Sequence, residues 1–408
     1  MPATPSSPIP AALTQLTHTA PRQLHHAEAP HLLAYLARVP DPRAARGRRH
    51  RLVTILALAA AAVLAGARSI AAIAEWAADT PQQVRVVLGA RQQAPGCFAV
   101  PAEATIRRTL SRLDADTLAG VIGAWLADRD RHREDDRPGP ATRQRRAVAV
   151  DGKTLRGAHT PGGDGRPVHL LAAMDHTSRV VLAQRQVAGA PQEVPAFTEL
   201  LACLDLEGVV VTADALQTHP EAAEFLVTRK QAHYLLVVKA NQPTLLDRCA
   251  RLAWHRVPVG DRTRDRGHGR VEIRTLKAIS VRHFGFPHAA QVIQVTRKTR
   301  DLGSSKWRTV TVYAITSLPF ELARPARLAD LLRGHWAIEN GLHYIRDTTF
   351  AEDASQVRTG SAPHVMASLR NLAIGVLSRA GPVNLAAALR RHARDPHRPL
   401  ATLGISLG

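Results

Sequence analysis

Apolar residues recur at helical spacing through the first third of the chain. The longest apolar run covers residues 52–67, is rich in alanine and has arginine on both sides. It is shorter than the ~20 strongly apolar residues that a membrane span needs, so it predicts a buried helix. Shorter amphipathic stretches predict further helices over residues 31–37, 69–78, 81–88, 105–113 and 117–129. We therefore expect a helical N-terminal domain over residues 31–140, preceded by a loose tail over residues 1–30.

The pattern changes beyond a charged segment that Pro and Gly interrupt, residues 131–146. Short runs of apolar and β-branched residues then alternate with amphipathic helices. The expected strands cover residues 147–150, 168–174, 179–187, 208–212 and 234–238, and the expected helices cover residues 195–206 and 220–230. The second and third strands flank a short turn and form a hairpin. This order of elements predicts a mixed α/β sheet covered by helices.

Three more β-rich stretches with few helix signals cover residues 271–281, 290–298 and 307–315. They predict an inserted sheet at about residues 261–320. Helices resume at Leu328 and continue to about Arg379, which gives a second domain over residues 141–380. The remaining residues, 381–408, predict a basic C-terminal tail.

The charge of the chain points to a polyanionic partner. There are 54 Lys and Arg residues against 34 Asp and Glu residues, a formal net charge of +20. Such an excess favours binding to phosphate groups, and arginine clusters at residues 41–51 and 131–146 are the expected places for it. Most of the cations are arginine, so genome composition alone could also produce the excess. The three separated cysteines argue against a disulfide scaffold or a zinc ribbon and favour a cytoplasmic protein without a membrane partner.

Two aspartates follow apolar runs in the second domain. Asp151 comes after Ala-Val-Ala-Val, and Asp214 comes after Val-Val-Val-Thr-Ala. Carboxylates at the ends of neighbouring strands meet at one edge of an α/β sheet, where they can share hard divalent cations. Glu339, from a helix across this edge, would complete a two-metal site. For any one aspartate, a turn or a helix cap is the simpler interpretation.

Other interpretations of the same region stay open. His335, Glu339 and His343 are spaced four residues apart and could be zinc ligands, but three ligands on one straight helix would need a fourth from elsewhere. Trp336 could stack on a base, although a core position is the more usual one. The basic helix expected at residues 105–113 could enter a DNA groove or face solvent.

Several blocks of the sequence resemble DDE transposases of bacterial insertion sequences. The resemblance is closest to the ISAs-type branch, which includes the H-repeat-associated proteins. The similar blocks are residues 151–157 (DGKTLRG), 212–215, 234–242, 267–274 and 335–343, with Asp347, Phe350, Glu352 and Asp353. They keep the family's order from about residue 40 to about residue 380. One loop departs from the family pattern, residues 189–194.

The resemblance implies a ribonuclease-H-like catalytic core with a β-rich insertion before the last acid. It assigns Asp151, Asp214 and Glu339 as the triad that binds two Mg²⁺ ions, with Mn²⁺ as an alternative. In such a site one ion activates a water or a DNA 3′-hydroxyl and the other stabilises the leaving oxygen. The expected DNA contacts are Lys153, Arg156, Lys239, Asn241, His335 and Arg346. The last two stand where related transposases have arginine and lysine.

The sequence therefore predicts a DNA transposase that cuts the ends of its element and joins them to target DNA. The expected partners are terminal inverted repeats, target DNA and a second copy of the chain on paired ends, in a cytoplasmic, nucleoid-associated setting. Two alternatives remain: a catalytically silent DNA-binding remnant of a decayed element, and a stand-alone metal-dependent nuclease.

Overall fold

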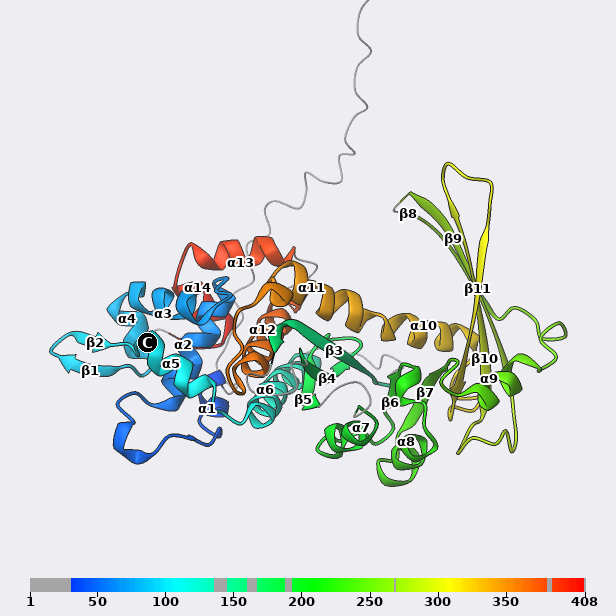
Figure 1. Cartoon of the computed structure of the whole chain (residues 1–408), viewed down its shortest axis with the longest axis horizontal. Helices are drawn as coiled ribbons and strands as arrows, with labels where there is room; N and C mark the ends of the chain where they lie inside the picture. Colours follow the sequence, from blue (N-terminus) through cyan, green and yellow to red (C-terminus); the bar gives the residue numbers. More distant parts are fainter. Residues whose placement is uncertain are drawn as a thin grey trace, which may run out of the picture.

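The computed structural model describes residues 31–135, 145–159, 167–187, 193–267, 269–379 and 384–406 (Figure 1). The tail expected over residues 1–30 and most of the charged segment at 131–146 lie outside these ranges. Within them the chain has a mixed α/β architecture. Helices gather at one end of the molecule, and a β-rich arm extends from the other end (Figure 1).

The N-terminal region is mainly helical, as the apolar spacing predicts. Its helices are α1 (Leu32–Leu36), α2 (Leu52–Leu64), α3 (Ile70–Asp79), α4 (Gln82–Val87), α5 (Glu103–Leu110) and α6 (Ala115–Asp135), with a 3-10 turn η2 (Ala45–Gly47). Helix α2 is the long apolar run, and all its residues but Val53 are buried. Between α4 and α5 the chain forms a hairpin, β1 (Arg91–Ala94) and β2 (Cys97–Ala99). Its turn contains Gly96, which has a positive φ of 69°.

The centre of the molecule is a nine-stranded sheet in the order β5-β4-β3-β6-β7-β11-β10-β9-β8. The strands are β3 (Ala147–His159), β4 (Pro167–Asp175), β5 (Val181–Val187), β6 (Val210–Ala213), β7 (His233–Val238), β8 (Asp261–Gly267), β9 (Arg270–Ser280), β10 (Gln291–Asp301) and β11 (Arg308–Thr316). Strands β3, β6 and β7 are parallel to one another, and the remaining pairs are antiparallel. The predicted hairpin is confirmed as β4 and β5.

Two features of the sheet differ from the prediction. Strand β3 does not end at Val150 but continues to His159, because residues 151–155 and 159 also pair with β4. The insertion is not a separate sheet. Strand β11 pairs with β7, so the four strands β8 to β11 extend the central sheet. Strand β8 was not predicted, because its polar sequence, DRTRDRG, gives no apolar alternation.

Helices cover the sheet and join it to the N-terminal region. They are α7 (Glu193–Ala202), α8 (Pro220–Glu224), α9 (Pro243–Ala250), α10 (Pro325–His335), α11 (Tyr344–Thr348) and α12 (Ala362–Ser378). Short turns lie between them: η4 (Ala215–Gln217), η5 (Phe225–Arg229), η6 (Glu339–His343) and η7 (Glu352–Ala354). Helix α12 is buried along nearly its whole length and packs against α2, α6 and β5. One continuous hydrophobic cluster therefore joins the N-terminal helices to the sheet.

The predicted basic tail is wrong for its described part. Residues 384–406 form α13 (Leu385–Ala393) and α14 (His397–Thr402), which pack against α2 and α12. Their large buried apolar side chains are Leu389, Leu400, Leu403 and Ile405. Four arginines (Arg390, Arg391, Arg394 and Arg398) are interspersed with these apolar residues, so the amphipathic character is hard to see in the sequence.

Candidate active site

The two predicted aspartates lie at adjoining positions of paired strands. Strands β3 and β6 run parallel, and the last pair in their register is Val150 with Ala213. The next residue on β3 is Asp151, and the next residue after the end of β6 is Asp214. The side chains of both are partly exposed, 20% for Asp151 and 41% for Asp214. The edge where β6 ends therefore carries two neighbouring carboxylates that solvent can reach.

Glu339 lies on a helical segment that crosses this edge. His335, four residues before it, contacts the Thr212 hydroxyl on β6 at 3.1 Å. His343, four residues after it, has Nδ1 3.5 Å from Oδ2 of Asp151 on β3. Glu339 is exposed and begins the π-helical turn η6, a kind of turn frequent at functional sites. The three acids thus come from three elements that meet at one place.

His335 is a buried link rather than a DNA contact. It is only 4% exposed, and the Thr212 hydroxyl that it contacts also bonds His176 Nε2 at 2.9 Å. Burial lowers the pKa of His335 from 6.5 to about 4, although Asp214 acts in the opposite direction. A neutral, enclosed imidazole cannot offer positive charge to a phosphate. The predicted DNA contact by His335 is therefore not compatible with its position.

Acid should destabilise the protein through His335. Its pKa is lower in the folded chain than in the unfolded chain, so between pH 6.5 and about 4 the unfolded state binds the extra proton. Stability should fall as the pH drops through this window, by up to ~1.4 kcal/mol per pH unit. His335→Gln should flatten the dependence of melting temperature on pH, and the exposed His255→Gln should not. Equal slopes for the two variants would contradict this account.

Lys239 and Asn241 lie beside Asp214, after strand β7. The Lys239 ammonium is 2.8 Å from Oδ1 and 2.9 Å from Oδ2 of Asp214. Its side chain is 54% exposed, so it can also face a bound ligand. The Asn241 amide donates to the Ala215 carbonyl at 2.7 Å, which fixes the turn that follows Asp214. Both residues therefore shape the surroundings of this carboxylate.

Lys153 and Arg156 have different positions on β3. The Lys153 side chain is 8% exposed, and its ammonium donates to Asp347 Oδ2 at 2.7 Å, which ties β3 to α11. This enclosure is not compatible with the predicted DNA contact by Lys153. The Arg156 side chain is 82% exposed. Its Nε lies 3.7 Å from Asp353 Oδ2, which is a long ion pair, so the guanidinium remains available to a phosphate.

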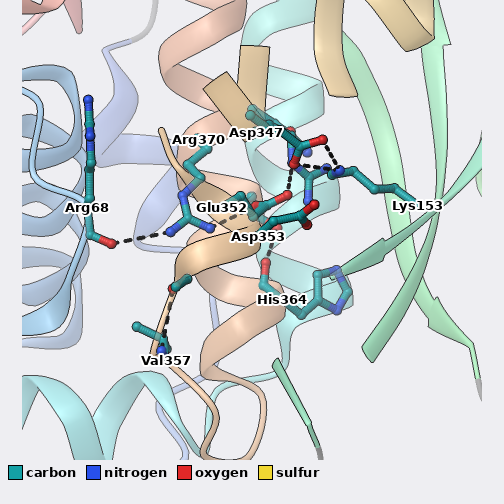
Figure 2. A network of polar contacts seen from close by, with 12 residues as sticks. Arg68, Lys153, Asp347, Glu352, Asp353, Val357, His364 and Arg370 are labelled. Carbon is teal, nitrogen blue, oxygen red and sulfur yellow. Dashed lines mark hydrogen bonds and ion pairs between the residues drawn. The ribbon is translucent and has the colours of Figure 1, made fainter. Parts of the chain in front are cut away.

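Arg346 belongs to a buried ion-pair network, which Figure 2 shows in part. Its fully buried guanidinium donates to Glu352 Oε2 at 2.7 Å, and Arg370 donates to Glu352 Oε1 at 2.8 Å. Arg370 also donates to the Arg68 carbonyl of the N-terminal region at 3.3 Å. Burial raises the pKa of Glu352, but the two guanidiniums outweigh it and hold the pKa below its usual range. The predicted DNA contact by Arg346 is therefore wrong in this structure.

Trp336 is not a core residue. It is 43% exposed, and the guanidiniums of Arg274 and Arg297 lie 5.4 Å and 5.9 Å from its ring centroid. All three line a cavity of about 250 Å³ that also reaches Asp214 and Lys239. The helix docks instead through apolar residues such as Leu342, which is fully buried.

The donor set fits hard divalent cations in its chemistry. Carboxylate oxygens are the ligands that Mg²⁺ prefers, and Asp214 already faces a cationic group, the Lys239 ammonium. Among the residues that the structure describes, no three His, Cys, Asp or Glu side chains are arranged to hold a metal ion. For zinc, the two histidines of the 335–343 block contact different strands instead of converging on one point.

Comparison with known proteins gives the family. A model of the transposase DDE domain matches residues 142–375, and a model named DDE_Tnp_1-associated matches residues 33–126. The chain belongs to the DDE transposase family. All three acids of this transposase lie within the matched DDE domain. The resemblance seen in the sequence motifs is therefore confirmed.

Curated relatives match over most of the transposase. "Putative transposase YncI" of Escherichia coli O157:H7 is 27% identical over 85% of this chain and 87% of its own length. "H repeat-associated putative transposase YhhI" of Escherichia coli K12 is 25% identical over 85% of this chain and 90% of its own length. A solved piggyBac transposase synaptic complex with hairpin DNA aligns with 10% identity and a TM-score of 0.38, over 91% of this chain and 78% of that one.

The helices of the transposase give no sign of a membrane span. In the described ranges, none of them combines the length and the apolar character that crossing a bilayer requires. The apolar run predicted to be a buried helix, α2, packs inside the protein.

Proposed function

We propose that this transposase cuts the ends of its own element and joins them to target DNA, with divalent metal ions held by Asp151, Asp214 and Glu339. The observation that carries the proposal is the placement of the two aspartates directly beyond the paired residues Val150 and Ala213, under the segment that carries Glu339. The strand order β5-β4-β3-β6-β7 supports a ribonuclease-H-like core.

The chain's own residues hold the acids in position. The sheet fixes the backbone of Asp151 and of Ala213, the residue before Asp214, so the two carboxylates need little reorganisation to receive a ligand. His335 and His343 hold the segment with Glu339 against β6 and β3. Bound Mg²⁺ or Mn²⁺ would activate the attacking hydroxyl and stabilise the leaving oxygen. Arg156 and Lys239 supply cations for the DNA phosphates.

The partners follow from the reaction. Element ends carry terminal inverted repeats, and joining them in one event requires two ends and two catalytic sites, so we propose a homodimer on paired ends. The net charge of +20 supports DNA as the ligand. Such a protein would work in the cytoplasm, associated with the nucleoid.

Metal removal provides the direct test. Purified protein with Mg²⁺ should nick labelled element ends and join them to a target duplex, and EDTA should abolish both products. Mn²⁺ added after EDTA should restore them, since its oxygen coordination resembles that of Mg²⁺. Products on a gel separate the alternatives: binding without any product indicates a silent remnant, and cleavage without joined strands indicates a stand-alone nuclease. Products that persist in EDTA would contradict the metal-dependent mechanism.

A further inference from the structure

The arm formed by β8 to β11 has two faces with very different charge. Side chains alternate between the faces of a strand, and residues paired across strands lie on the same face. One face contains Glu272, which pairs with Arg270 at 3.6 Å, with Arg297 at 2.7 Å and with Arg274. Trp336 packs against Arg274 and Arg297, so this face is turned toward the cavity beside Asp214. We call it the inner face.

The other, outer face carries cations without acids. The register of β8, β9 and β10 gives it three cross-strand rows, each beginning with a β8 arginine. The rows are Arg262-Thr275-Thr296, Arg264-Ile273-Lys298 and Arg266-Val271-Arg300. Strand β11 extends the first two rows with Thr311 and Thr309. Among the described residues, no acid forms an ion pair with the three β8 arginines, which are all exposed.

The size and composition of the outer face suit a phosphate backbone. Four residues of an extended strand cover ~13 Å, and the step from β8 to β10 covers ~10 Å. A DNA duplex carries about 8 phosphate charges over ~13 Å of its axis. The threonine hydroxyls between the cations can donate to phosphate oxygens as well. A protein partner would need an apolar centre, and the apolar residues of these rows, Ile273 and Val271, are partly or fully covered.

Edge protection alone does not explain this arrangement. Charged side chains on β8 would be enough to prevent another strand from pairing with this edge. The cations continue inward to Lys298 and Arg300 on β10, two strands from the edge. Arg300 also lies 5.2 Å from the ring centroid of Trp307, which is 38% exposed. This contact holds the guanidinium over the sheet.

We propose that the outer face of β8 to β10 binds the phosphate backbone of a DNA duplex distinct from the DNA at the acids. The two faces of one sheet point in opposite directions, so a duplex at the inner face and a duplex at the outer face are separated by the sheet itself. The inference rests on the proposed function only in taking DNA as the ligand. The arm would then hold a second duplex while the first duplex lies at Asp151, Asp214 and Glu339.

The test compares two variants with equal loss of charge. The first is Arg262→Gln with Arg264→Gln and Arg266→Gln. The control is Arg390→Gln with Arg391→Gln and Arg394→Gln, three exposed arginines around α13 at the opposite end of the molecule (Figure 1). Binding of a fluorescein-labelled random-sequence duplex is measured without metal between about 50 and 200 mM NaCl. A tight-binding titration then counts duplexes per chain.

The outer-face variant should lower the slope of log K against log salt by about 3, and the control by less than about 1. The number of duplexes per chain should fall from two to one in the outer-face variant alone. An unchanged slope overturns the inference, and so does a reduced slope with unchanged stoichiometry, because the face would then hold the same duplex as the acids. Wild-type protein that binds no duplex would instead contradict the proposed function.

Discussion

Asp151→Asn should lower the rate of strand cleavage by about 10³-fold while leaving DNA binding and folding unchanged. Asparagine has nearly the same size and keeps an oxygen that His343 Nδ1 can approach, as it approaches Asp151 at 3.5 Å. It removes one negative charge from the pair of adjoining carboxylates. Two divalent ions repel each other, and fewer carboxylates cannot hold both. The rate of nicking of a labelled element end, measured with saturating Mg²⁺, checks this expectation.

A matched variant separates loss of chemistry from loss of charge. Asp247→Asn removes the same charge from an exposed i, i+4 pair with Arg251 on α9. It should nick DNA at the wild-type rate, because such surface pairs contribute little. Asp151→Asn protein that retains more than a tenth of wild-type cleavage would remove this residue from the catalytic set. Loss of cleavage in both variants would indicate a general charge effect.

The sequence pattern reveals the site where local signals are strong. The apolar runs before Asp151 and Asp214 predict strands, and the acids stand out at the ends of those runs. The position of Glu339 depends on a π-helical turn and on contacts by His335 and His343 with two different strands. No periodicity encodes those contacts. The sequence therefore makes Glu339 a candidate for the third acid, and the resemblance to the family motifs assigns it.

Long-range pairing explains the predictions that differ from the structure. Arginine is a residue type that commonly contacts DNA, but Arg346 donates to the buried Glu352, which also accepts from Arg370. Lys153 is expected from the family motifs to contact DNA, yet β3 continues past it and places it against Asp347. A charged residue is expected to be exposed unless a partner distant in the sequence is known to bury it. Buried ion pairs are therefore invisible to patterns of hydrophobic and polar positions.

The Glu352 network offers the largest expected effect on stability. Glu352 is 1% exposed, and both its partners, Arg346 and Arg370, have buried side chains. Glu352→Gln keeps the shape but leaves two buried guanidiniums without a counter-charge. Removing one partner of a buried ion pair costs about 3–5 kcal/mol. Because a chain of 408 residues shifts by only about 1 °C per kcal/mol, we expect the melting temperature to fall by roughly 3–6 °C in a calorimetric scan.

The neighbouring acid is the natural control. Asp353 has a 32% exposed side chain and lies 3.7 Å from the exposed Arg156, so Asp353→Asn should change stability by less than ~1 kcal/mol. The pKa of Glu352 is lower in the folded chain, so its contribution is present above its ordinary value of 4.5 and is lost as the pH falls below it. Glu352→Gln should therefore lose its difference from wild type in strong acid.

A second substitution distinguishes an ion-pair effect from a packing effect. If the uncompensated guanidiniums cause the loss, adding Arg370→Met to Glu352→Gln should cost less than the sum of the two single changes. The reason is that Met fills much of the space of the arginine stem and removes one of the two stranded charges. Additive losses would show that shape, not charge, holds α12 against α11. A Glu352→Gln protein as stable as Asp353→Asn would exclude the network as a main source of stability.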